Sequence, residues 1–376
     1  MLNLFSFFHL NLAFSSIEVE NHKDIIKICY WPLLKLIEET QVPIAIEASG
    51  YTLERIKQID KEWINKLKSL INMDLCEFIG CGYAQIIAPI TSSKLNLKNL
   101  EIGMDTYNTI LGFKPTIGLI NEQAFSKGTA QIYKKAGYKS ILMEWNNLYC
   151  LNTQKWNTNY RYYKQYIEIS KSSKIQVLWN NSISFQQFQR YVHGDISDIE
   201  YNEYIYKNIN NENRFMCFYG NDAEIFNYRP GRYKTEKEIK DDEWAIIKEL
   251  IIQLQKHEQI NFCSMNDVIN YRGNKNIGNT LKIENPDCPI SVKKQNKYNI
   301  NRWAVTGKND FSINTRCWRI FNNLIVNKST SYDEWKKLCY LWSLFIDINI
   351  QILFDLNSFD YKIKDYIFEI KMNKHL

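Results

Sequence analysis

Short apolar segments alternate with longer amphipathic segments along most of this chain, and this alternation limits the folds it can adopt. We expect strands at residues 2–8, 43–47, 75–79, 116–120, 139–143, 175–179, 214–219 and 260–263. We expect helices at residues 22–40, 52–71, 94–111, 124–136, 184–192 and 235–257. Because the strand segments are almost continuously apolar, they favour parallel strands that helices cover on both faces. About seven β/α repeats predict an α/β fold, an incomplete TIM-like barrel more than an open sheet.

The remaining segments suggest how the chain is organised around this barrel. The polar insertions 146–172 and 193–213 are candidate loops over a site. Residues 273–297 contain glycines and prolines and are expected to be a linker. Helical patterns then recur at 314–326, 331–349 and 358–373. We therefore expect a catalytic domain at 1–272, followed by the linker and a small C-terminal helical region at 298–376.

Two sequence patterns indicate where individual helices begin. Asp60 precedes the helical stretch that starts at Lys61 and is a candidate N-cap residue. Thr235 with Glu238 has the spacing of a capping box ahead of an apolar stretch.

Composition excludes several classes of partner. The net charge is +6, from 47 basic and 41 acidic residues that are mixed along the chain, so we expect no nucleic-acid partner. The apolar start at residues 1–9 is interrupted by polar side chains and lacks a basic flank, so we expect a core strand and no membrane insertion. Nine cysteines without CxxC spacing favour reduced thiols in a cytoplasmic protein. The five histidines show no metal-ligand spacing, and we expect no metal or other cofactor.

Two carboxylate motifs each follow a predicted strand. Glu122 comes after the apolar segment 116–120, and Asp222 comes after the apolar segment 214–219. Strand ends are where repeated β/α folds collect catalytic groups. Two carboxylates at such positions are the minimum equipment for cleaving or transferring a glycosidic bond.

The ordered motifs resemble those of glycoside hydrolase family 57 over roughly residues 5–232. His9-Leu-Asn11 stands where that family has a His-x-His-Gln-Pro motif, and Glu77-Phe-Ile-Gly-Cys-Gly-Tyr83 resembles its second motif. Ile120-Asn-Glu122 resembles the motif of the catalytic nucleophile. Asn221-Asp222-Ala-Glu224-Ile-Phe226, with Pro230-Gly231, resembles the motif of the general acid/base. The resemblance implies a seven-stranded incomplete barrel followed by helices.

The resemblance also implies roles for single residues. Glu122 corresponds to the nucleophile and Asp222 to the general acid/base of a retaining glycosidase or glucanotransferase that acts on α-linked oligosaccharide or polysaccharide. Candidate substrate-binding residues are His9, Glu47, Glu77, Tyr83, Trp145, Glu224, Tyr228 and Arg229. Glu77 could equally form structural hydrogen bonds, and His9 could equally be a satisfied core residue.

The chain departs from the family pattern in its first motif, and this departure keeps other functions open. Asn11-Leu-Ala13 replaces the second His and the Gln-Pro of the family. Leu or Ile stands where a Trp usually precedes the nucleophile. A carbohydrate-binding protein of glycan assembly that has lost catalysis is therefore one alternative. A polysaccharide deacetylase is another, although the Asp/His/His set that such enzymes need is not visible in the sequence.

Overall fold

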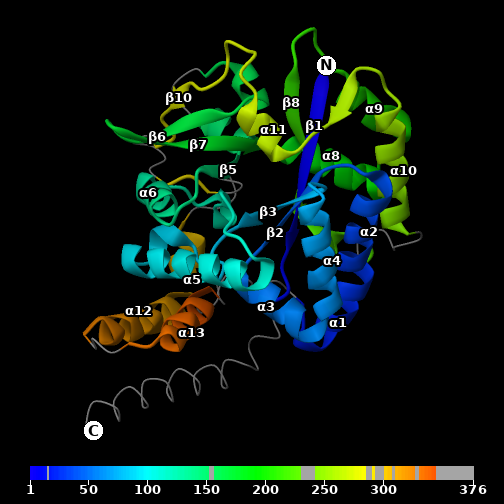
Figure 1. Ribbon diagram of the computed structural model, residues 1–376. Helices are drawn as coiled ribbons and strands as arrows, with labels where there is room; N and C mark the ends of the chain where they lie inside the picture. The colour runs from blue at the N-terminus through cyan, green and yellow to red at the C-terminus, as the bar shows by residue number, and fades with distance from the viewer. Residues whose placement is uncertain are drawn as a thin grey trace.

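The computed structural model describes residues 1–14, 17–151, 156–229, 242–284, 290–292, 300–306, 310–326 and 330–343. At its centre, seven parallel strands form one curved sheet in the order β7-β5-β4-β3-β2-β1-β8 (Figure 1). The strands are β1 (Leu2–Leu10), β2 (Ile44–Ala48), β3 (Cys76–Gly80), β4 (Ile117–Leu119), β5 (Ser140–Glu144), β7 (Ser173–Asn180) and β8 (Arg214–Asp222). The predicted α/β fold is confirmed.

Three further strands extend this sheet. β9 (Ile260–Phe262) pairs in parallel with the start of β1. β6 (Gln165–Ser170) is antiparallel to β7, and β10 (Thr280–Leu281) pairs with β6 at the edge. β6 lies inside a polar segment predicted as loop, and the two-residue β10 lies inside the predicted linker.

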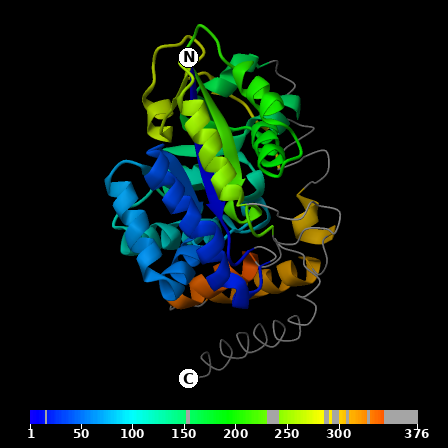
Figure 2. The same cartoon turned by 90° about the vertical axis from the view of Figure 1, so that its right-hand side faces the viewer.

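Helices cover the outer face of the sheet, and α2 and α10 lie side by side on it (Figure 2). Their bounds are α1 (His22–Ile25), α2 (Trp31–Thr40), α3 (Gly50–Ile59), α4 (Lys61–Asn72), α5 (Ser93–Leu111), α6 (Lys127–Lys135), α7 (Trp145–Leu151), α8 (Ser182–Val192), α9 (Asp198–Tyr206), α10 (Glu243–Gln255), α11 (Met265–Asn270), α12 (Asp310–Val326) and α13 (Tyr332–Ser343). A π-helical turn (Ile26–Tyr30) joins α1 to α2.

Local sequence explains most helix boundaries. The predicted helix 52–71 is two helices, because Asp60 ends α3 and its side chain accepts a hydrogen bond from the Trp63 N–H at the start of α4 (3.1 Å). The predicted helix 235–257 is described as α10 from Glu243 onward. Thr235 and Glu238 lie outside the described residues, as does the predicted helix 358–373.

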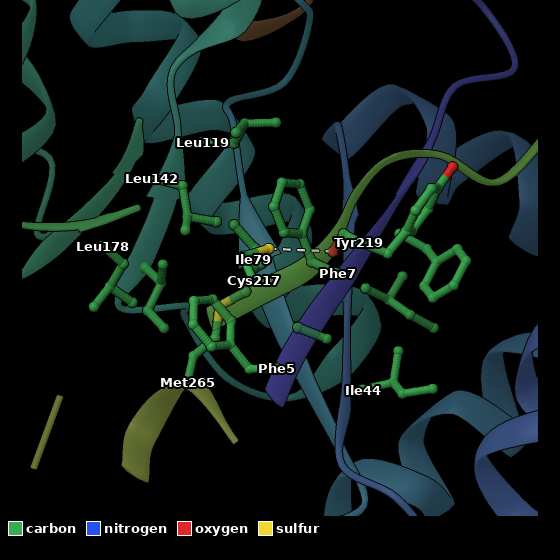
Figure 3. Packing of buried hydrophobic residues seen from close by; sticks show 14 of the residues in the cluster. Phe5, Phe7, Ile44, Ile79, Leu119, Leu142, Leu178, Cys217, Tyr219 and Met265 are labelled. Atoms are coloured by element: carbon green, nitrogen blue, oxygen red, sulfur yellow. Dashed lines mark hydrogen bonds between the residues drawn. The ribbon is translucent and has the colours of Figure 1, made fainter. Parts of the chain in front are cut away.

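Apolar side chains from the strands fill the space that the curved sheet encloses. Phe5 and Phe7 of β1 gather there with residues of β3, β4, β5, β7 and β8 (Figure 3), namely Ile79, Leu119, Leu142, Leu178 and Cys217. These side chains are buried, and burying each large one stabilises the fold by about 1.5–3 kcal/mol. The interior is therefore packed, and the chemistry must lie beyond it at a strand end.

The two end strands of the seven, β7 and β8, meet without backbone pairing. The Asn180 side chain at the end of β7 donates a hydrogen bond to the Gly220 carbonyl of β8 (2.7 Å). A Cβ atom on Gly220 would lie 2.4 Å from Asn180 Oδ1 and 2.5 Å from Phe7 Cε1, so only glycine permits this approach. A side-chain contact thus joins the ends of the sheet, as expected of an incomplete barrel.

The C-terminal helices α12 and α13 lie at the end of the molecule opposite the N-terminus, beside α5 (Figure 1). Since β1 runs from the N-terminus toward that end, the helices lie at the carboxyl ends of the parallel strands. They form a second apolar cluster with the loop between β3 and α5 (residues 81–92, the β3–α5 loop), including Ile86, Ile87, Trp335 and Leu338. The strand ends are therefore partly covered by the C-terminal region.

Candidate active site

Three polar residues form a row across neighbouring strands near their carboxyl ends. In the strand register, His9 of β1 is the partner of Glu47 in β2 and of Asp222 in β8. Register partners on parallel strands project to the same face of a sheet, so the three side chains lie together. The Glu47 carboxylate is fully buried and pairs with His9 Nδ1. The row connects a buried acid, an imidazole and a carboxylate at the rim.

Both ring nitrogens of His9 are engaged within the protein. Nδ1 pairs with Glu47, and Nε2 is hydrogen-bonded to the Gln85 amide (2.9 Å). Burial alone would lower the pKa of His9, but the charge and hydrogen bond of Glu47 outweigh it and raise the pKa to about 9. His9 is therefore a cation at neutral pH, and its Nε2–H then requires the Gln85 amide to turn its oxygen toward the ring.

Glu224 joins the end of β1 to the turn that follows β8. Its Oε1 accepts hydrogen bonds from the Asn11 backbone N–H (2.7 Å) and from the Tyr30 hydroxyl. Its side chain is almost completely buried. Burial, followed by the nearby Asp222 charge, raises the pKa of Glu224 to about 7. This carboxyl group is therefore poised to gain or lose a proton near neutral pH.

Asp222 is the last residue of β8 and is half-buried. The Tyr219 hydroxyl donates to its backbone carbonyl (2.6 Å), which holds the main chain in place. Among the described residues, none forms a hydrogen bond or ion pair with its carboxylate. The charge of Asp222 raises the pKa of both His9 and Glu224, so its carboxylate lies close to both groups.

Glu122 lies just beyond the end of β4 in a strained backbone conformation. Its φ is +51° and that of Gln123 is +56°, two successive left-handed residues that are not glycine. Such conformations cost of order 1–3 kcal/mol each and cluster at functional sites. Within the described part of the chain, the Glu122 carboxylate has no hydrogen-bond or ion-pair partner, and the residue is half-buried.

Neighbouring side chains hold this strained turn in place. Asn121 Nδ2 donates to the carbonyls of Cys81 (3.5 Å) and Ile86 (3.2 Å) in the β3–α5 loop. On the other side, the Glu144 backbone N–H donates to Gln123 Oε1 (2.8 Å). Hydrogen bonds of its two neighbours thus hold Glu122 between the β3–α5 loop and the end of β5. The same loop carries Gln85, which contacts His9.

Glu77 and Arg229 are not brought to this row by the structure. Glu77 lies near the start of β3, where its two oxygens accept the Met265 and Asn266 N–H groups of α11 (2.6 and 3.0 Å). Its placement fits the structural hydrogen bonding that the sequence left open. Arg229 follows Glu224, but its guanidinium is nearly buried and pairs with Glu243 of α10.

Tyr83 and Trp145 are built into packed surroundings. The Tyr83 hydroxyl donates to Glu54 Oε2 (3.0 Å), and Lys336 of α13 lies over its ring at 4.7 Å. Trp145 is 2% exposed and packs among aromatic rings, namely Tyr149, Trp156 and Trp179. Tyr228 remains half-buried. For these residues, sugar contact stays a prediction.

Sequence reasoning missed two contributors to the site, Gln85 and Glu144. Gln85 bridges His9 and Asn11, although the distance from Asn11 Nδ2 to Gln85 Oε1 is long (3.5 Å). Glu144, at the end of β5, accepts N–H groups that begin α7 and α8, including those of Asn147 (2.7 Å) and Ser182 (3.2 Å). Glu144 follows an apolar strand, as Glu122 does, and that signal could have found it. Gln85 lies in a loop and carried no such signal.

The described residues contain neither a metal-binding cluster nor a membrane-spanning helix. No group of three or more His, Cys, Asp or Glu side chains in that part of the chain is arranged to hold a metal ion. Each described helix is too short or too polar to span a lipid bilayer. A cleft of about 570 Å³ lies on the outer face between α2, α4 and α10, and its lining includes Trp31, Lys66 and Trp244 but none of the candidate site residues.

Comparison with known proteins places these features in a family. The sequence model of glycosyl hydrolase family 57 matches residues 5–284, most of the chain. The chain belongs to glycosyl hydrolase family 57. An alpha-amylase of Pyrococcus furiosus is 20% identical over 235 residues, which are 62% of this chain and 34% of the amylase.

Solved structures of family 57 enzymes share the fold. A 4-alpha-glucanotransferase from Thermococcus litoralis superposes with a TM-score of 0.70 at 14% identity, covering 90% of this chain and 55% of the enzyme. A GH57-type branching enzyme from Pyrococcus horikoshii gives a TM-score of 0.67 at 11% identity, covering 98% of this chain and 88% of the enzyme. This family 57 chain thus spans about a third of the length of the amylase and about half that of the glucanotransferase.

Proposed function

We propose that this family 57 chain is a retaining carbohydrate-active enzyme that hydrolyses or transfers α-linked glucan. The observation that supports it best is the placement of Glu122 just past the end of β4 and of Asp222 at the last residue of β8. Both carboxylates are half-buried and without a partner in the described structure, whereas Glu47, Glu77, Glu144 and Glu224 are occupied by protein donors. The named activities of the relatives, on α-glucans, suggest the substrate class.

In the proposed mechanism, Glu122 and Asp222 act in two steps. The Glu122 carboxylate attacks the anomeric carbon while Asp222 protonates the departing glycosidic oxygen, which leaves a glycosyl group on Glu122. Asp222, now ionised, then takes a proton from water or from an acceptor sugar hydroxyl, which displaces Glu122. Water gives hydrolysis and a sugar gives transfer. The His9–Glu47 pair and Glu224 lie beside Asp222, and their charges act on its carboxyl group.

Replacement of each carboxylate tests these roles. We expect Glu122→Gln and Asp222→Asn each to lower kcat/KM on a malto-oligosaccharide at least about 100-fold, since each removes one of the two groups that make or break the bond. Steady-state product analysis measures this loss, and circular dichroism checks the fold. The matched control is Glu168→Gln, which removes the same charge from a surface pair with Lys127 (3.6 Å).

The two roles can be separated by chemistry. Azide added to Glu122→Ala should restore cleavage of an activated aryl glycoside, because a small nucleophile replaces the missing carboxylate. Asp222→Ala should retain most of its kcat/KM for that activated substrate, because the first step then needs no protonation of the leaving group, whereas kcat should fall because the second step loses its base. If Glu122→Ala and Asp222→Ala process both a malto-oligosaccharide and an activated aryl glycoside at wild-type rates, the assignment is wrong.

A binding protein without catalysis is the second candidate function, and Asn11 is the observation that favours it. Asn11 replaces the family's second His. Its side chain hydrogen-bonds to the local backbone, where it accepts from the Phe14 N–H (3.0 Å) and donates to the Phe14 carbonyl (3.2 Å). Oligosaccharide binding measured by calorimetry, with no turnover of a panel of α-glucans and aryl glycosides, would select this function over the first.

A further inference from the structure

Asp222 and Glu224 stand two residues apart on either side of Ala223, at the junction of β8 with a 3-10 turn (Ala223–Ile225). Both carboxyl groups face the end of β1. Asp222 is the register partner of His9, and Glu224 accepts the Asn11 N–H. The charge of Asp222 raises the pKa of Glu224, so the two carboxylates repel each other and ionising the second is unfavourable.

The charges around this pair are already matched by other groups. The His9 cation is paired with Glu47 of β2. From the π-helical turn, Tyr30 donates to Glu224, and the neutral thiol of Cys29 lies nearby, its pKa raised by burial and by the Glu224 charge. Arg229, after the 3-10 turn, pairs with Glu243 of α10. No unmatched cation among the described residues is therefore at hand to stabilise a second carboxylate.

The hydrogen bonds of Glu224 also fix where its proton would sit. Oε1 accepts both the Asn11 N–H and the Tyr30 hydroxyl, so it has no room for a proton of its own. Oε2 has no hydrogen-bond partner within the described structure, and unlike Oε1 of Glu47 it is not sealed from solvent. A protonated Glu224 therefore carries its hydrogen on the oxygen that is left open.

We propose that Asp222 and Glu224 are not both ionised at neutral pH, although no hydrogen bond joins the two carboxyl groups in the described structure, and that Glu224 is the positioning residue through which Asp222 keeps a proton available. The proposal rests on the proposed function, because it deepens the acid/base role of Asp222. The charge of Glu224 discourages Asp222 from ionising, while its hydrogen bonds brace the end of β1. The pKa of Glu224, raised to about 7, agrees with this arrangement.

The pH profile of Glu224→Gln tests the proposal. The amide oxygen of Gln still accepts both hydrogen bonds, but the charge is gone, so Asp222 ionises more easily. We expect the alkaline limb of kcat/KM to move to lower pH by about one unit. Tyr30→Phe removes a donor to the carboxylate and should move the limb to higher pH. Glu168→Gln is the control and should leave it unchanged. An unmoved limb in Glu224→Gln would mean that Glu224 only braces the loop, and the proposal would be overturned.

A measurement without substrate separates this proposal from the proposed function. Carboxyl carbon NMR of the full chain, with Glu224 assigned through Glu224→Gln, reports the titration directly. We expect a midpoint near 7 that falls in Asp222→Asn, since the neighbouring charge is removed. A midpoint at the ordinary value of 4.5, or one that ignores Asp222→Asn, overturns the proposal whether or not any glucan is turned over.

Discussion

At the scale of single residues, the buried pair of His9 and Glu47 controls the charge at the centre of the candidate site. Glu47 has no exposure and His9 has little, so neither charge is screened by solvent. Each charge is tolerated only because the other is present. The pair places a fixed positive charge beside Asp222 and an equal negative charge one strand further away.

Replacing Glu47 should release His9 from this arrangement. We expect Glu47→Gln to lower the pKa of His9 below its value of about 9, because the charge that opposes the burial cost is lost. Breaking the buried pair should also decrease the free energy of unfolding by about 3 kcal/mol. Nitrogen NMR of the imidazole and urea unfolding measure the two effects. A His9 pKa that stays near 9 in this variant would show that Glu47 is not its cause.

The sequence predicted the position of a side chain in the fold where that side chain follows a strand, while the roles of these residues stay predictions. Glu122, Asp222 and Glu47 stand at strand ends, and the strand pattern placed them at one edge of the sheet. It could not place Gln85, because a loop residue gains its position from the turn that precedes it, here at Gly82 with a φ of +105°. Nor could it show that Glu77 binds a helix that follows 188 residues later.

At the scale of elements, the contact between β7 and β8 depends on a missing side chain. We expect Gly220→Ala to decrease the free energy of unfolding by about 1–3 kcal/mol, since its Cβ atom would overlap Asn180 and Phe7. Urea denaturation measures the loss. The matched control is Gly128→Ala in α6, where the nearest atom is 3.7 Å away and alanine favours the helix by up to about 1 kcal/mol. Equal stability of the two variants would contradict the role given to Gly220.

The order of elements could be predicted because strands and helices differ in period and length. All eight predicted strands are present, within a few residues of their expected bounds. β6 was missed because its alternating residues lie inside a Tyr- and Asn-rich segment that was read as a polar loop. α9 was missed because its apolar residues do not gather on one face, and its capping box of Ser197 and Glu200 was not recognised. The predicted division into domain, linker and helical region remains a prediction.

At the scale of the whole molecule, the buried groups give folding a defined pH dependence. The folded pKa of Glu224, about 7, lies above its ordinary value of 4.5, so the folded state binds the proton more tightly. The stability it contributes is fully present below pH 4.5 and is lost as pH rises through 7. His9 behaves likewise between its ordinary value of 6.5 and about 9.

The difference between wild type and Glu224→Gln isolates the first of these effects. We expect wild type to lose up to about 3 kcal/mol of unfolding free energy relative to the variant as pH rises from 4.5 to 7. Chemical denaturation at several pH values measures this difference, in which the contributions of groups that do not interact with Glu224 cancel. A difference that does not change with pH would contradict the raised pKa.

The β3–α5 loop links the candidate site to the C-terminal helices. It touches the imidazole through Gln85, steadies the Glu122 turn through Ile86, and meets the C-terminal helices through Ile86 and Ile87. A substitution in those helices that shifts the loop is therefore expected to disturb the Glu122 turn and the His9 imidazole together. The packing of α12 and α13 is in this way coupled to the geometry of the candidate site.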